Sequence, residues 1–400
     1  MSARARSLIL IAGAQVLALS AWFASSAALP GMIASGAVSA AESAALTSLV
    51  QVGFVAGALT SAWLMLSDRF DARRVFAIGA LGAGVSSLIS SGAEPGSEVM
   101  LASRFAAGAS LALVYPVGMK LAASWARNDA GLLVGLLVGA LTLGSAAPHL
   151  VPGLMGDIDW RAPFIASGAA AVLAGIIILA SEPGPAFKPA RRFDPSAIFT
   201  LFRRPHLREI NLGYLGHMWE LYAFWAWLGA FLVAWREARG GQPELEIGFL
   251  TFAVIAIGAV GALGAGWLAD RFGRTLVTSA AMALSGACAL LTAWVWAGPG
   301  WAMIVLLLMY GVVVIADSAQ FSAGLAEMAP ADQAGSLLTL QTALGFALTV
   351  VTVQALPYWA ELVGWRYAFL PLAVGPFLGV WAMLRLRGRP EAAAMASGRR

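Results

Sequence analysis

The segment ADRFGRTLV at residues 269–277 lies between two long apolar stretches, and a near copy, SDRFDARRV, occupies residues 67–75. The two copies start 202 positions apart, about half of the 400-residue chain. Such a spacing predicts that one half of the chain duplicates the other. Two further pairs keep nearly the same spacing: DWRAPF at 159–164 with GWRYAF at 364–369, and AGLL at 130–133 with AGSL at 334–337.

The composition is that of a protein embedded in a lipid bilayer. Hydrophobic residues make up 60% of the chain and charged residues 12%, whereas a soluble domain is about 25% charged. The mean hydropathy is +0.79. The apolar stretches have the length of about 20 residues that a helix needs to cross the hydrocarbon layer, without the alternation of outer-membrane strands. The chain is therefore expected to be an all-α integral membrane protein.

The apolar stretches predict twelve transmembrane helices in two bundles of six. We expect an N-terminal six-helix bundle at 1–181, a cytoplasmic linker rich in Pro and Arg at 182–208, a C-terminal six-helix bundle at 209–388 and a cytoplasmic tail at 389–400. The expected spans are 7–32, 45–66, 75–92, 98–125, 131–153, 162–181, 209–234, 245–268, 275–297, 301–328, 333–357 and 366–385.

Basic residues give the orientation. With both termini cytoplasmic, 19 of the 25 Lys and Arg fall in cytoplasmic segments, 4 in external loops and 2 within spans. Such an excess is typical of cytoplasmic loops. We therefore expect a multi-pass protein of the cell membrane with both termini inside, and we read the net charge of +4 as topology, with no nucleic acid as a partner.

The first apolar stretch has a second reading, as a secretory signal, because Arg4 and Arg6 precede it. It continues to Pro30, longer than the 7–15 residues of a signal core, so a retained helix is expected. The single cysteine, Cys288, can form no intrachain disulfide and is expected as a small buried hydrophobic residue.

Two motifs carry a resemblance to a known family. GWLADRFGR at 266–274 is similar throughout to the cytoplasmic-loop signature of the major facilitator superfamily, and RFAAGASLA at 104–112 resembles its fourth-helix motif. The resemblance covers the whole chain and implies two parallel halves that rock about a binding site between them. In the first half Leu64, Asp71 and Ala72 depart from the signature.

The resemblance also implies a conformational gate in the two loops. An Asp at the cytoplasmic end of a helix can face the positive N-terminus of a helix in the other half, and Arg can pair with carboxylates there. The family implies that these contacts stabilise the outward-facing state; charged loops that only obey topology are the alternative. The expected gate residues are Asp68, Arg69, Gly266, Asp270, Arg271, Gly273 and Arg274.

Ionisable residues inside spans are costly, so each needs a cavity or a partner. Asp317 in span 10 and Glu220 in span 7 are expected as proton-coupling groups. Arg104 in span 4 joins them by resemblance, although a planar guanidinium could equally bind an anionic substrate. Permanent structural pairing is the alternative for Asp317 and Arg104. Lys120 is expected to extend toward the cytoplasmic edge, with anion binding as the alternative.

By resemblance, spans 1, 4, 7 and 10 line the central cavity. Polar and aromatic residues on their inner faces could bind a solute by hydrogen bonds, stacking or cation–π contacts, or could simply pack between helices. The expected cavity residues are Gln15, Trp22, Tyr115, His217, Phe224, Tyr310 and Gln320.

These observations favour a secondary transporter. The sequence contains no P-loop and no metal or nucleophile constellation, so we expect neither an enzyme nor a cofactor. We expect a monomer that moves a small organic solute with protons. Gly135, Gly144 and Gly153 keep the spacing of the family's antiporter motif, which favours export, but Pro148, His149 and Pro152 depart from it. Close helix packing by small residues is the alternative reading of these glycines. The alternatives are uptake of an organic anion held by Arg104 and Lys120, and a transporter-like receptor without flux.

Overall fold

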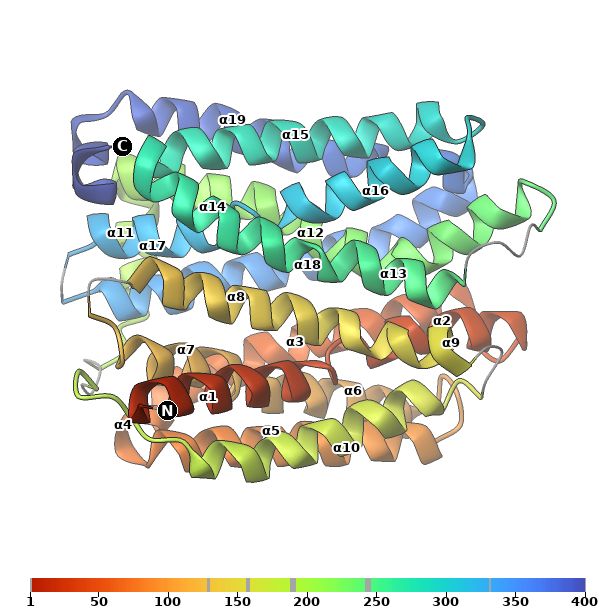
Figure 1. The fold of residues 1–400 in the computed structure, drawn as a ribbon, viewed down its shortest axis with the longest axis horizontal. Coiled ribbons are helices and arrows are strands. Elements are labelled where there is room, and N and C mark those ends of the chain that lie inside the picture. Colours follow the sequence, from red (N-terminus) through yellow and green to blue (C-terminus); the bar gives the residue numbers. More distant parts are fainter. Residues whose placement is uncertain are drawn as a thin grey trace.

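The protein is a bundle of long helices that run side by side (Figure 1). The computed structural model describes residues 2–127, 130–155, 159–187, 192–241, 246–330 and 332–399, and these residues form helices and turns without any strand. Both chain termini lie at the same end of the bundle (Figure 1), which we call the termini end. Residues 188–191 of the expected linker fall outside the described residues.

The first-half helices run from the N-terminus to the linker. They are α1 (Ala3–Leu19), α2 (Ala24–Ala34), α3 (Ala40–Leu64), α4 (Leu66–Arg69), α5 (Ala72–Gly92), α6 (Glu98–Leu111), α7 (Tyr115–Ala123), α8 (Ala130–Ala146), η1 (Ala147–His149), α9 (Leu150–Met155), α10 (Ala162–Ile177) and η2 (Ile178–Ala180).

The second-half helices follow a short linker helix. They are α11 (Ala197–Arg203) in the linker, then α12 (Pro205–Glu237), α13 (Ile247–Ala256), α14 (Gly258–Phe272), α15 (Arg274–Val295), α16 (Gly300–Val314), α17 (Ser318–Met328), α18 (Ala334–Val363), η3 (Trp365–Tyr367), η4 (Leu370–Ala373), α19 (Val374–Arg387) and η5 (Pro390–Gly398).

Local sequence fixes several helix ends. The side chains of Ser2, Ser39 and Ser97 accept hydrogen bonds from the first turns of α1, α3 and α6, which satisfies amide groups that have no partner inside the helix. Gly273, with φ of +94°, ends α14 and starts α15, a backbone conformation that glycine adopts at little cost.

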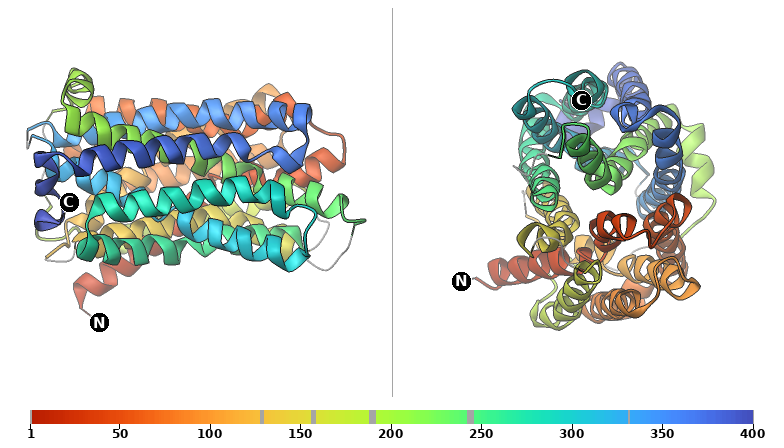
Figure 2. Two further views of the ribbon diagram at one scale, coloured as in Figure 1. Left: turned by 90° about the horizontal axis from the view of Figure 1, so that it is seen from above. Right: turned by 90° about the vertical axis from the view of Figure 1, so that its right-hand side faces the viewer.

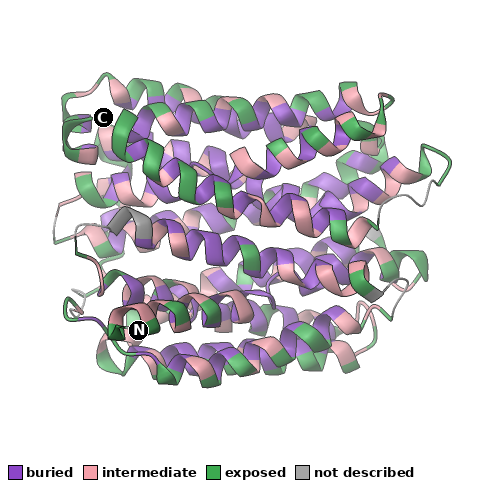
Figure 3. Ribbon diagram, in the orientation of Figure 1, coloured by how far each residue is buried: buried purple, intermediate pink, exposed green. Residues whose placement is uncertain are grey.

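In the part of the chain that the structure describes, eleven segments are long and apolar enough to cross a membrane. The remaining expected span, the seventh in chain order, corresponds to α12, whose sequence includes Asn211, His217 and Glu220. These three side chains are buried in the bundle. Since other helices surround α12, it needs less apolar surface than a helix that faces lipid. Buried residues lie along the inner faces of the helices (Figure 3).

The two halves form two groups of helices. Figure 2 shows the first-half helices, coloured red to yellow-green, gathered on one side of the bundle and the second-half helices, green to blue, on the other. Between the groups, α3 packs against α18 and α8 packs against α13 and α14. Because α3 and α14 are second spans and α8 and α18 are fifth spans of their halves, the same pairing occurs twice, as expected of a duplicated unit.

Glycines at equivalent positions set the closest helix crossings. A Cβ at Gly108 of α6 would lie 1.9 Å from the carbonyl oxygen of Val50 on α3, and a Cβ at Gly311 of α16 would lie 1.9 Å from that of Val254 on α13. The positions of the two glycines differ by 203 and those of the two valines by 204. Small residues let membrane helices approach this closely.

Replacing either glycine by alanine should destabilise the protein. Gly108→Ala and Gly311→Ala each force two backbones apart, and overpacking of this kind costs about 1–3 kcal/mol. Gly264→Ala is the matched control, because no described atom lies within 4 Å of the added Cβ. Thermal unfolding of the purified protein in detergent measures the effect. Equal melting temperatures for all three variants would contradict these crossings.

Candidate functional site

Among the described residues, three spans are interrupted by turns of three or four residues near the middle of the bundle. The first span breaks at residues 20–23, between α1 and α2; the fourth at 112–114, between α6 and α7; and the tenth at 315–317, between α16 and α17. The expected first and tenth spans are each present as one membrane-crossing segment, Ala3–Ala34 and Gly300–Met328, built from two helices joined by a short turn. Interrupted helices leave backbone groups unpaired, which membrane proteins tolerate only where protein or water surrounds them.

Arg104 supports the break in the first span. Its Nη2 donates hydrogen bonds to the carbonyl oxygens of Ala21 and Trp22, at 2.9 and 3.0 Å. The guanidinium is fully buried and lies 5.5 Å from the ring centroid of Phe164. Among the described residues, no carboxylate forms a salt bridge with Arg104. In this conformation Arg104 thus stabilises the broken helix.

Asp317 lies at the break in the tenth span, next to His217 of α12. Oδ1 of Asp317 is 2.8 Å from Nδ1 of His217, and both side chains are almost fully buried. The two atoms are at salt-bridge distance, but Oδ1 of Asp317 has no partner among the described residues that meets hydrogen-bond geometry. The other ring nitrogen, Nε2 of His217, has no partner among the described residues.

Glu220 occupies a separate polar site one turn along α12. Its Oε1 accepts a hydrogen bond of 2.7 Å from the hydroxyl of Tyr310, and its Oε2 accepts one of 2.8 Å from Ser285. The carboxyl is 1% exposed, and no cation of the described residues forms an ion pair with it. Phe224 stacks on Tyr310, with 4.0 Å between ring centroids, and helps to enclose the site.

A small cavity of about 50 Å³ lies between the two halves at this level. Its walls come from α7, α8, α12, α17 and α18 and combine aromatic rings, hydroxyl groups and aliphatic side chains. The lining residues are Tyr115, Met119, Val134, Val138, Leu141, Tyr214, His217, Met218, Leu221, Tyr222, Ser318, Ala319, Ser322, Thr342 and Phe346. A pocket for a drug-sized ligand usually encloses about 300–1,000 Å³, so the site is contracted in this conformation.

Aromatic residues from both halves close the cavity on the side away from the termini. Trp22 lies 4.8 Å from Phe54, 5.8 Å from Tyr222 and 5.2 Å from Phe346, between ring centroids. Phe23 contacts Tyr222 as well. Tyr222 and Phe346 also line the cavity, so we call these five residues the aromatic cluster and regard it as the cover of the cavity.

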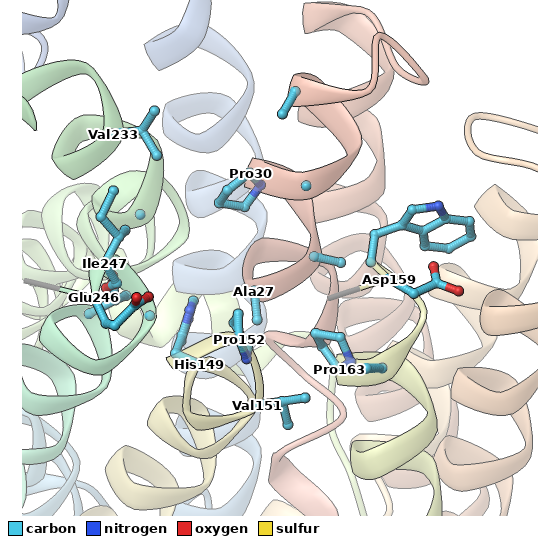
Figure 4. Close-up of a pocket in the computed structure, with 18 of the residues that line it drawn as sticks. Ala27, Pro30, His149, Val151, Pro152, Asp159, Pro163, Val233, Glu246 and Ile247 are labelled. Carbon is cyan, nitrogen blue, oxygen red and sulfur yellow. The ribbon is translucent and has the colours of Figure 1, made fainter. Parts of the chain in front are cut away.

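A second pocket, of about 230 Å³, is lined by residues of both halves (Figure 4). Pro30 of α2 and Pro163 of α10 face it from the first half, while Val233 and Ile247 face it from the second half. The labelled side chains of His149, Asp159 and Glu246 add polar groups at its wall (Figure 4). This pocket is therefore a crevice between the halves at the end opposite to the termini.

In the first-half loop, the expected gate residues make contacts within their own half. Asp68 pairs with Lys120 of α7, and Lys120 also lies 4.8 Å from the ring of Phe187. Arg69 is exposed. Arg73 donates hydrogen bonds to Asp71 and holds the pKa of that carboxyl below its usual value.

The expected gate residues of the second-half loop also make their described contacts within their own half. Arg274 pairs with Glu327 at 2.6 Å and donates to Oε1 of Gln320 at 2.6 Å. The backbone carbonyl of Asp270 accepts a hydrogen bond from Arg399. The guanidinium of Arg271 lies 3.8 Å from the ring centroid of Trp267, and Gly266 is part of α14. Stabilisation of another conformation by contacts across the halves stays a prediction.

Only part of the expected cavity set lines the cavity. Tyr115 and His217 do so. Trp22 belongs to the aromatic cluster, Gln15 donates to the carbonyl of Leu137, and Gln320 accepts from Arg274. Phe224 and Tyr310, described above, surround Glu220.

Sequence reasoning missed most of the remaining lining residues. Tyr214 precedes His217 by one helical turn, and Ser318 and Ser322 are spaced by four residues beside Asp317, so helical periodicity could have identified these three. Thr342 and Phe346 come from α18, whose one acidic residue, Glu361, is exposed near the end of the helix and gave no signal for the cavity.

Comparisons with known proteins agree with this architecture. A family model described as Major Facilitator Superfamily matches residues 11–236, and one described as Sugar (and other) transporter matches residues 206–390. The fold is similar to the crystal structure of a D-xylose-proton symporter, with a TM-score of 0.77 and 14% identity over 98% of this chain and 99% of that chain. No curated protein sequence matches the chain. At this identity the structural likeness shows the fold alone.

Opening the aromatic cluster should expose the cavity to solvent at the end of the bundle opposite to the termini end. We expect Trp22→Ala to raise the labelling rate of Ser318→Cys by a membrane-impermeant thiol reagent about tenfold or more, because one large ring fills the centre of the cover. The native Cys288 is buried and is replaced by alanine. Trp294→Ala, at a residue that is 80% exposed on the bundle surface, is the control. Equal labelling in both variants would show that the cluster is not the cover.

Proposed function

Because the chain belongs to the major facilitator superfamily, we propose that it is a proton-coupled secondary transporter that exports a small organic solute by alternating access. Membership of the family supports secondary transport in a membrane and argues against an enzyme. Proton coupling, the direction of transport and the solute are the parts that this proposal adds.

The pair of Asp317 and His217 is the observation that carries the proposal. The pair lies at a helix break beside the cavity between the halves, and both side chains are buried. An ionised group in the membrane interior costs about 2.5–3.5 kcal/mol on insertion scales, so one proton more or less on this pair changes the free energy of closing the site. Protonation is thereby linked to the conformation of the two halves.

The structure offers the parts that alternating access needs. The aromatic cluster joins the halves above the cavity through ring contacts, and a hydrogen bond of 2.6 Å from Nε2 of Gln354 to the hydroxyl of Ser48 joins α18 to α3. The ion pairs of both loops lie within single halves. Rocking of one half against the other would separate the cluster and leave these ion pairs intact.

We propose exchange on the assumption that solute and proton compete for one carboxylate, Asp317. If solute and proton use Asp317 in turn, the proton gradient across a cell membrane drives the solute outward, with the termini end in the cytoplasm. Glu220 would be the second titratable group of this pathway, since its charge also has no cationic partner among the described residues.

Proton–sugar symport is the second candidate, favoured by the likeness of the fold to the D-xylose-proton symporter. Anion uptake is less well supported, because Arg104 binds backbone carbonyls and Lys120 pairs with Asp68. A receptor without flux would share the fold but show no solute-dependent proton movement.

Proteoliposomes with an imposed pH gradient test proton coupling. We expect a panel of amines, sugars and carboxylates to contain a solute that releases lumenal protons, measured with a trapped pH dye. Asp317→Asn should lower this proton flux about tenfold or more, because it removes a titratable group at the site, and Glu220→Gln should lower it as well. Glu361→Gln, which removes an equal charge from an exposed position on α18, should leave the flux unchanged.

Two results would count against proton coupling. Full proton flux in Asp317→Asn would remove this carboxyl from the mechanism. Solute movement that ignores the pH gradient in the wild-type protein would remove proton coupling altogether, although secondary transport would remain.

Cross-linking tests the rocking of the halves. Ser48→Cys combined with Gln354→Cys, in a Cys288→Ala background, should permit a short reducible bis-thiosulfonate to join α3 and α18 across the contact described above. Transport should fall to background after cross-linking and return after reduction, since the linked halves cannot separate. Either single cysteine variant is the control, and undiminished transport in the linked protein would rule out separation at this contact.

A further inference from the structure

The chemistry of the cavity wall narrows the solute class. Four of the lining residues carry aromatic rings on three helices: Tyr115 on α7, Tyr214 and Tyr222 on α12, and Phe346 on α18. The faces of such rings attract cations, and cages of several aromatic rings are known for binding ammonium groups. Rings on different helices can surround a ligand, whereas a single ring could only stack on one face.

The charges around the cavity favour a positive ligand. Among the described residues, no Lys or Arg lines it. Arg104 and Lys120 of the first half do not line the cavity. Nη2 of buried Arg104 donates to backbone carbonyls, and half-buried Lys120 pairs with Asp68. The nearest acid–base pair of the wall is His217 with Asp317, and with one shared proton this pair carries a negative charge. An anion would meet that charge without a counter-ion, whereas a cation would be paired.

The unpartnered nitrogen of His217 adds a preference for an N–H donor. When Nδ1 holds the proton that faces Asp317, Nε2 is an acceptor. Nε2 has no partner among the described residues, the side chain is 1% exposed, and His217 lines the cavity. Burying a polar atom without a hydrogen bond is costly, so a ligand that donates to Nε2 gains free energy that one without a donor does not.

Apolar contacts complete the wall. Leucine, valine, methionine and alanine side chains supply seven of the fifteen lining residues, and none of the fifteen carries a carboxamide. A sugar needs a hydrogen-bond partner for each hydroxyl group, and this wall offers hydroxyl groups and one imidazole but no carboxylate or carboxamide of its own. The wall suits a ligand with one charged donor and an apolar body.

We propose that the central cavity binds a protonated organic amine with an apolar body, its N–H directed at Nε2 of His217 and its charge balanced by Asp317. This inference rests on the transport function proposed above and names the solute that this site takes. The contracted volume of about 50 Å³ means that the amine enters when the halves move apart.

Direct binding to the purified full-length protein tests the inference without any transport. The probes share a phenylethyl-sized body: N,N-dimethyl-2-phenylethylammonium has one N–H, its N-trimethyl analogue has the charge but no N–H, and N,N-dimethyl-phenylacetamide has neither. Phenylacetate and D-xylose represent anions and sugars. Titration calorimetry in detergent should rank the dimethylammonium first, the trimethylammonium second and the amide about tenfold or more below the first.

Variants separate the contributions to binding. Asp317→Asn should weaken binding of both cations about tenfold and leave the amide unaffected. Tyr115→Leu should weaken both cations severalfold, whereas Tyr115→Phe, which keeps the ring, should bind as the wild type does. Glu361→Gln is the charge control. The melting temperature of each variant shows whether it is folded, and Tyr115→Leu keeps the test decisive if Asp317→Asn does not fold.

The outcomes separate this inference from the proposed function. Equal affinity for the dimethylammonium and the amide, or binding of phenylacetate or D-xylose in preference to both cations, would overturn the amine site, whatever the proteoliposomes show. The predicted ranking together with absent proton flux would leave the amine site standing and refute proton-coupled transport. The predicted ranking together with amine-dependent proton release would support both.

Discussion

A membrane helix can be interrupted only where protein or water satisfies its free backbone groups, because hydrocarbon offers them no hydrogen bond. The rest of this structure depends on that constraint. The interruptions in the first, fourth and tenth spans all lie inside the bundle, and Arg104 donates to two of the freed carbonyls. The breaks bring Trp22 into the cover of the cavity and Asp317 beside His217. The site therefore lies at the level of these helix interruptions.

The second organising feature is that the ion pairs seen among the described residues join groups of the same half. Lys120 with Asp68, and Arg274 with Glu327, each join helices or loops of one half, and His217 with Asp317 does the same beside the cavity. Across the halves, the aromatic cluster contributes tilted and stacked ring contacts, whose separation leaves no buried charge without its partner. Ion pairs within each half, combined with ring contacts between the halves, suit two bodies that move against each other.

The two halves keep equivalent helix breaks and crossings, but they do not carry equivalent ionisable residues. The breaks at 112–114 and 315–317 are 203 positions apart, as are Gly108 and Gly311. Yet Val114 occupies the position equivalent to Asp317, and the acidic groups that we assign to coupling lie only in the second half. The first half contributes Arg104 and aromatic rings instead. The same helix geometry in both halves thus supports two walls of the cavity that differ in their chemistry.

The sequence by itself determined the all-helical membrane fold, the order of the spans and the identity of Asp317, Glu220 and His217 as unusual residues, because hydropathy, charge segregation and the rarity of buried ionisable groups are local properties. It did not reveal the pairing of Asp317 with His217, the role of Gln320 as a partner of Arg274, or the contribution of Phe346. Helical periodicity fixes which residues share a face of one helix. Only tertiary packing, set by close crossings such as that at Gly108, decides what that face meets.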